Sequence, residues 1–176
     1  EYLVGITDLH PGVDGLVSIR GPENLCFDII DQPEVFENAT AILLPAFEKQ
    51  FEELCRITQK YQIGVSNWMG LYKKDPWYVT SADFICMVSE ENFQEFILPE
   101  IIEEIHYLQG NTIFHLDGPG ALRHLDSLLA IPELAGIQWV YGAGQPSAKY
   151  WIDILKRIQK AGKAINIGLH REDIDT

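Results

Sequence analysis

Short runs of β-branched and aliphatic residues alternate along the chain with longer runs in which apolar residues recur at helical spacing. The short runs are bounded by Gly, Pro, Asp or Asn, which is typical of strands that end in turns. They predict strands at residues 3–7, 62–66, 112–116, 136–140 and 164–167.

The longer runs predict helices between these strands. Asp31 and Pro33 favour a helix start, and apolar residues follow at helical spacing as far as Leu54. Pro45 lies within this run, where we expect a kink. The other helices are predicted at residues 89–108, 120–129 and 151–161, and a loop at residues 8–15.

Strands that alternate with helices predict right-handed crossovers and a parallel sheet, so the fold class is α/β. The sheet is either open and complete in itself, or part of a (β/α)8 TIM barrel, which needs about 250 residues. Each strand–helix unit takes roughly forty residues, so 176 residues are too few for a whole barrel. We interpret residues 1–176 as a single domain that forms about the C-terminal half of such a barrel, with an open parallel sheet as the alternative.

Composition narrows the classes of partner and location. The formal net charge of −13 repels phosphate backbones, so we expect no nucleic-acid partner. No apolar run approaches the roughly 18 residues of a membrane helix, so we expect no membrane span. The three cysteines, Cys26, Cys55 and Cys86, form no CxxC motif, which fits a reducing cytoplasm.

Polar and aromatic side chains gather where the predicted strands end. In parallel α/β folds the carboxyl ends of the strands hold the functional groups. The residues at these ends are Asp8, His10, Asp14, Asn67, Trp68, His115, Asp117, Trp139, Tyr141, Asn166 and His170. The clustering favours a pocket and does not identify a reaction.

His115-Leu116-Asp117 is the most specific motif in the chain. Residues i and i+2 of a strand point to the same face, so His115 and Asp117 can share a proton or a metal ion. A catalytic metal needs about three protein ligands, of which this motif supplies two. Asp8 or His10 can complete the set if the fold brings them close. The alternative is a histidine that hydrogen-bonds Asp117 and fixes the turn.

Other motifs favour structural roles or none. Asp117-Gly118-Pro119-Gly120 is neither a dinucleotide-binding nor a phosphate-binding loop, and we interpret it as a turn. Asp8 and His10 can equally brace their own loop. We expect His106 and His124 to lie on helix surfaces. No serine or cysteine has the surroundings of a nucleophile.

Three segments resemble the uroporphyrinogen decarboxylase and corrinoid methyltransferase superfamily. Residues 89–99 resemble its S-P-E-x-F-x-E-F-x-L-P motif, residues 114–118 lie at its next strand, and residues 136–139 resemble a later strand of the form G-x-x-x-x-D-W. The resemblance covers most of the chain, best over residues 83–167. It implies a (β/α)8 barrel.

The resemblance also implies activities. Its methyltransferase members bind zinc and move methyl groups between corrinoid proteins and thiols such as coenzyme M, and they carry His-x-Cys where this chain has His115-x-Asp117. The carboxylate replaces a thiolate and makes the site harder, which puts thiol activation by zinc in doubt. Its decarboxylase members usually lack this histidine, so the chain matches neither branch cleanly.

We therefore expect a methyltransferase-like enzyme that acts on a small molecule or a corrinoid protein. Its catalytic residues would be His115, Asp117, Asp8 and His10. Zinc or another divalent ion would be held by His115 and Asp117, and a corrinoid is a further expected cofactor. The residues expected to line the ligand are Trp68, Trp139, Tyr141, Asp14 and His170. The alternatives are a porphyrinogen decarboxylase and a non-catalytic protein that binds a corrinoid or another small ligand.

A half barrel would leave two strand edges unpaired, at residues 3–7 and 164–167. It would also expose side chains that face the barrel interior, for which the candidates are Ile6, Val65, Phe114 and Ile137. We expect the edges to pair with a missing N-terminal half or with a second copy of the chain.

Overall fold

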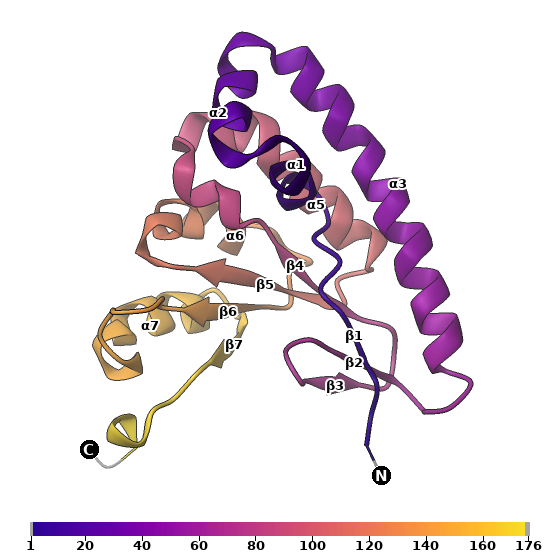
Figure 1. Ribbon diagram of the computed structural model, residues 1–176. Coiled ribbons are helices and arrows are strands. Elements are labelled where there is room, and N and C mark those ends of the chain that lie inside the picture. The colour runs from indigo at the N-terminus through magenta and orange to yellow at the C-terminus, as the bar shows by residue number, and fades with distance from the viewer. Residues whose placement is uncertain (1, 175–176) are drawn as a thin grey trace.

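The computed structural model describes residues 2–174, which form an α/β fold with two sheets (Figure 1). The larger sheet has four parallel strands in sequence order: β4 (Tyr78–Ser81), β5 (Thr112–Asp117), β6 (Gly136–Val140) and β7 (Ala164–Ile167). In the smaller sheet, β2 (Val65–Asn67) lies between the parallel strand β1 (Gly5–Ile6) and the antiparallel strand β3 (Tyr72–Lys73).

Helices lie in the connections from β1 to β2 and between the successive strands β4, β5, β6 and β7. The α-helices are α1 (Val13–Arg20), α2 (Pro22–Asp31), α3 (Pro33–Thr58), α4 (Glu90–Asn92), α5 (Leu98–Tyr107), α6 (Leu125–Leu129) and α7 (Ile152–Lys160). Short 3-10 helices span Asp83–Met87, Pro119–His124, Ala148–Trp151 and Arg171–Asp173. In Figure 1, α5 lies beside β4 and β5, and α3 runs along the outside of α1, α2 and α5.

The strands predicted from alternation are confirmed best in the larger sheet, where β5, β6 and β7 agree with the expected ranges to within one residue. β1 and β2 are shorter than predicted. The loop predicted at residues 8–15 is wrong from Val13, where α1 begins, and α2 was not predicted. Gly21, with φ 82°, separates these two helices, and the many glycines and prolines there concealed their helical spacing.

Two prolines lie within long helical stretches. Pro45, where we expected a kink, lies inside the continuous helix α3. Pro99 lies in the first turn of α5, which follows a π-helical turn at Phe93–Ile97. Proline lacks an N–H and cannot donate to the carbonyl four residues earlier, so the chain widens locally before it.

The two faces of the larger sheet differ in character. On the covered face, Phe114, Leu116, Ile137 and Trp139 are fully buried and belong to the main hydrophobic core. The opposite face, here called the open face, carries half-buried residues of β5 and β6: Ile113, His115, Asp117, Gln138 and Val140.

The prediction of which side chains a half barrel would expose at its interior was wrong. Ile6, Val65, Phe114 and Ile137 are all buried rather than exposed. Neighbouring residues on a strand point to opposite faces, so a face that contains Phe114 cannot also contain His115. The open face is the one that carries His115.

Both strands predicted to be edges are edges of their sheets within residues 2–174. β7 ends the four-stranded sheet and β1 ends the three-stranded sheet. The four-stranded sheet is open in this part of the chain and does not close into a barrel. No helix among these residues is long and apolar enough to cross a membrane.

Candidate metal centre

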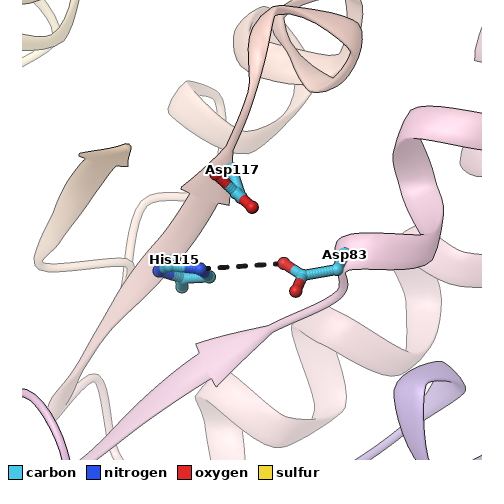
Figure 2. Close-up of side chains that lie close together, drawn as sticks. All are labelled: Asp83, His115 and Asp117. Atoms are coloured by element: carbon cyan, nitrogen blue, oxygen red, sulfur yellow. Dashed lines mark ion pairs between the residues drawn. The ribbon is translucent and has the colours of Figure 1, made fainter. Parts of the chain in front are cut away.

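Three side chains converge at the carboxyl ends of β4 and β5. His115 and Asp117 point from the open face of β5, and Asp83 lies just beyond β4 in the first turn of a 3-10 helix. One ligand atom from each of the three lies within 4.8 Å of the others (Figure 2). Because β4 and β5 are adjacent and parallel, the end of β4 brings Asp83 beside the end of β5.

His115 is held on two sides. Its Nδ1 lies 2.5 Å from Oε1 of Gln138, which is its register partner on β6. Its Nε2 lies 3.7 Å from Oδ1 of Asp83. The Trp68 indole makes an edge contact with the imidazole at 5.4 Å between ring centroids. The His115 side chain is only 14% exposed, so these neighbours fix its orientation.

Asp83 is positioned by Asp14. The two carboxylate oxygens of Asp14 accept hydrogen bonds from the backbone N–H groups of Asp83 and Phe84, at 2.8 and 3.1 Å. Partial loss of solvent and the Asp14 carboxylate raise the pKa of Asp83, and Asp117 and Asp8 add to the rise, while His115 opposes it. The charges that act on Asp83 are thus three carboxylates and one imidazole, a field that favours a cation.

Asp117 has an unsatisfied oxygen. Its Oδ1 is buried and accepts no hydrogen bond within the described residues. A buried carboxylate oxygen without a donor costs about 1–3 kcal/mol or more. A cation between Asp117, Asp83 and His115 would satisfy this oxygen.

Asp8 and His10 form a second pair close to the first group. His10 Nε2 lies 3.7 Å from Asp8 Oδ2, and the His10 backbone N–H donates to Asp8 Oδ1 at 3.1 Å. His10 adopts φ 43°, a strained value for a residue with a side chain. His10 and Asp83 both line a pocket of about 270 Å³ whose apolar walls include Val17, Phe84 and Met87.

The structure brings together some of the predicted site residues and separates others. His115 contacts Trp68 and has a ligand atom within 4.8 Å of one of Asp117, and His10 lines a pocket with Asp83. Asp14 is buried, supports the backbone at Asp83 and lines the same pocket as His10 and Asp83.

Trp139 does not line a pocket. It is fully buried on the covered face and packs edge-on against Trp151 at 5.2 Å, so the predicted role as a wall for a flat ligand is wrong. The reason is again the alternation of the strand, which points Gln138 and Trp139 to opposite faces.

Tyr141 and His170 lie beside each other, 6.2 Å apart between ring centroids, in the segments that follow β6 and β7. His170 lines a different pocket, of about 450 Å³, together with Gln145 and Ser147. The tail beside it is held by Asp173, whose carboxylate accepts hydrogen bonds around the start of the Ala148–Trp151 helix. The nearby Ser147 hydroxyl and the hydrogen bonds from the backbone N–H groups of His170 and Lys149 lower the pKa of Asp173 to about 2.

Sequence reasoning missed Asp83 and Gln138 and misplaced His124. The strand Tyr78–Ser81 has the residue types of a strand, and the chemistry expected at its carboxyl end would have pointed to Asp83. His124, expected on a helix surface, is buried against Phe93 at 4.2 Å between ring centroids. His106 is exposed, as predicted.

No protein-family model, curated protein or solved structure matches the chain.

Proposed function

We propose that the protein is a metal-dependent enzyme in which Asp83, His115 and Asp117 bind a divalent ion, and that it transfers methyl groups as the corrinoid methyltransferases do. One observation carries the metal site: the three ligand atoms lie within 4.8 Å of one another at the carboxyl ends of parallel strands. The methyl-transfer activity rests on the resemblance of the sequence to that superfamily.

The three side chains fit a divalent ion in number and type. Three protein ligands are the usual set at a catalytic metal that keeps a position open for substrate. Two ligands at about 2.1 Å from one ion in tetrahedral geometry lie about 3.4 Å apart, so a pair at the 4.8 Å limit needs to close by about 1.4 Å. Two carboxylates and one imidazole are suitable ligands for Zn²⁺, Mn²⁺ or Fe²⁺. A site built on thiolates would suit Mn²⁺ and Fe²⁺ less well.

The bound ion would act as a Lewis acid that lowers the pKa of a coordinated thiol or water. His10, which lines a pocket with Asp83 and pairs with Asp8, would accept the proton that the acceptor thiol loses. A methylated corrinoid would supply the methyl group and keep the electron pair of its carbon–cobalt bond, and the thiolate sulfur would form the new carbon–sulfur bond. The pocket with the walls Val17, Phe84 and Met87 would hold the apolar part of the acceptor.

Porphyrinogen decarboxylation, the alternative, fits the site less well. Porphyrinogen substrates carry several carboxylates, and the Asp8, Asp14 and Asp117 carboxylates already act together on Asp83. Like charges brought together in this way cost several kcal/mol. The field of the site therefore favours a metal ion over a poly-acid.

The resemblance also supports a (β/α)8 barrel for the full-length protein, in which the open face of β4–β7 would line the interior. The edges at β1 and β7 would then pair with further strands, from an N-terminal half of the barrel or from a second copy of the chain. A corrinoid protein would approach the carboxyl ends of the strands, where Asp83 and His115 lie.

Metal analysis tests the proposal. The purified protein, dialysed against Zn²⁺, Mn²⁺ or Fe²⁺, is expected to retain about one ion per chain. His115→Ala is expected to bind the ion at least 100-fold more weakly, since loss of a direct ligand exceeds the 10- to 100-fold effect of an outer one. His106→Ala, which removes an exposed histidine paired with Glu133 at 3.7 Å, is the matched control and should bind normally.

Activity is measured with methylcobalamin as the methyl donor and coenzyme M or an apolar thiol as the acceptor, by the loss of methylcobalamin absorbance. The metal-loaded protein is expected to be active and His115→Ala inactive. Equal ion binding by His115→Ala and the wild type would refute the metal site, and equal activity with and without metal would refute the mechanism.

A further inference from the structure

Resting on the proposed metal site, we infer that Gln138 is a positioning residue that holds His115 in its Nδ1–H tautomer and so directs the Nε2 lone pair at the ion. Within residues 2–174 the Gln138 side chain hydrogen-bonds His115 and makes no hydrogen bond to Asp83 or Asp117, so it would act through His115. Its role is therefore separable from that of the three ligands.

The register of the sheet places the two side chains together. His115 and Gln138 are partners in the parallel pair β5–β6, so they project side by side from the open face. The distance from His115 Nδ1 to Gln138 Oε1 is 2.5 Å. With Oε1 of Gln138 placed toward the ring, the amide oxygen accepts this hydrogen bond and Nδ1 donates it, which assigns the proton to Nδ1.

This assignment decides what Nε2 can do. A neutral imidazole carries one N–H, so a proton on Nδ1 leaves Nε2 with a free lone pair. That lone pair lies 3.7 Å from Asp83 Oδ1, which is also an acceptor. Two acceptors that face each other across such a gap repel unless a proton or a metal ion lies between them. The hydrogen bond to Gln138 thus prepares the gap for a cation.

Gln138 also fixes the orientation of the ring. A half-turn of the imidazole would exchange each nitrogen with a carbon and remove the nitrogen ligand from the side of Asp83. The hydrogen bond to Gln138 opposes that rotation, and the edge contact with Trp68 at 5.4 Å restricts the ring plane. An outer hydrogen bond that fixes the tautomer and orientation of a ligating histidine typically changes metal affinity 10- to 100-fold.

The test compares Gln138→Leu, which has a similar volume but no acceptor, with Gln138→Glu, which keeps an acceptor at the same place. Affinity for Zn²⁺ or Mn²⁺, measured by competition with a chelating dye, is expected to fall about 10- to 100-fold in Gln138→Leu and to return to at least the wild-type value in Gln138→Glu. Gln159→Leu, on the exposed surface of α7, is the matched control and should leave the affinity unchanged.

A second measurement reports the tautomer directly and needs no metal. Long-range ¹H–¹⁵N correlation spectra of the apoprotein at about pH 8.5, where an ordinary imidazole is neutral, are expected to show His115 protonated at Nδ1 in the wild type and in Gln138→Glu. In Gln138→Leu the two tautomers should be mixed. If Gln138→Leu does not fold, Gln138→Met replaces it in both measurements. Methionine removes the amide oxygen and has an unbranched side chain.

The outcomes separate this inference from the proposed function. A wild type that binds no ion but shows the Nδ1–H tautomer lost in Gln138→Leu would refute the metal site and support the positioning role. A wild type that binds the ion, with equal affinity and an unchanged tautomer in Gln138→Leu, would overturn the role of Gln138 and leave the metal site standing.

Discussion

The covered and open faces of the β4–β7 sheet come from the same strands but follow different rules. On the covered face Phe114 and Leu116 are fully buried among apolar neighbours, as a hydrophobic core requires. One residue along, His115 and Asp117 on the open face are half-buried, and an Asp117 oxygen has no donor. The covered face is mainly apolar, and the one polar atom of Trp139 on it, Nε1, also has no partner among the described residues, whereas the open face gathers His115 and Asp117 beside Asp83.

The contrast extends to the acids on each side. Glu104 of α5, near β4, is 3% exposed, and burial raises its pKa to about 8, so it is largely neutral at pH 7. Asp83, at the open face, feels three other carboxylates and one histidine. On the covered side Glu104, which is buried and has Glu100 and Asp14 nearby, is neutralised by a proton. On the open side the proposed metal ion would neutralise the cluster of acids.

Alanine substitutions at two adjacent residues of β5 give the largest expected difference in the free energy of unfolding. Phe114→Ala removes a fully buried ring and is expected to lower the free energy of unfolding by about 3–5 kcal/mol. His115→Ala, its neighbour on the open face, loses mainly one hydrogen bond and is expected to cost about 1 kcal/mol. Urea denaturation of the metal-free protein measures both. Equal losses would mean that the open face is packed like the core.

The pH dependence of stability gives an intermediate effect. Because burial raises the pKa of Glu104 to about 8 from 4.5, the unfolded state loses this proton before the folded state does. Stability contributed by the neutral acid is therefore present at low pH and is lost as the pH rises from about 4.5 to 8. Glu100, whose pKa burial also raises to about 8, acts in the same direction.

The contribution of Glu104 is best measured between about pH 6.5 and 8. Burial lowers the pKa of His124 in the folded protein, so below about pH 6.5 the unfolded state binds a proton at His124 and stability changes with pH in the opposite direction. Within the window, Glu104 should account for a fall of about 1.5 kcal/mol in the free energy of unfolding. Glu104→Gln should remove that fall, as measured by urea denaturation at a series of pH values. An unchanged slope would show that Glu104 is ionised in the folded protein.

The same contrast explains what the sequence could and could not predict. β5, β6 and β7 were found because their runs of aliphatic and aromatic residues are short and bounded by turn residues. His115 and Asp117 were found because their spacing of two places them on one face. Phe114 and Ile137 were assigned to the wrong face, because alternation shows which residues share a face but not which face the helices cover.

Contacts between strands were beyond the sequence. Asp83 reaches His115 only because β4 pairs with β5, and β4 was hidden in a stretch of aromatic residues. Gln138 meets His115 through the register of β5 and β6, which no local pattern records. Asp14 is a conspicuous acid in the sequence, but its hydrogen bonds to the backbone of Asp83 and Phe84 span about seventy positions.

The smallest expected effect concerns Trp68, which lies over the open face and not in the core. Its side chain is partly exposed and meets His115 by an edge contact, so Trp68→Phe should change the free energy of unfolding by less than about 1 kcal/mol.

Because the Trp68 indole contacts His115, a ligand of the proposed ion, binding of Co²⁺ should quench part of the tryptophan fluorescence in the wild type. That part should be absent in Trp68→Phe, which keeps an aromatic ring against His115 and should bind the ion normally. Trp139→Phe, which alters the covered face, is the control in which the quenching should persist. Equal quenching in Trp68→Phe and the wild type would place the ion away from His115. That result would contradict the proposal that the open face carries the functional site.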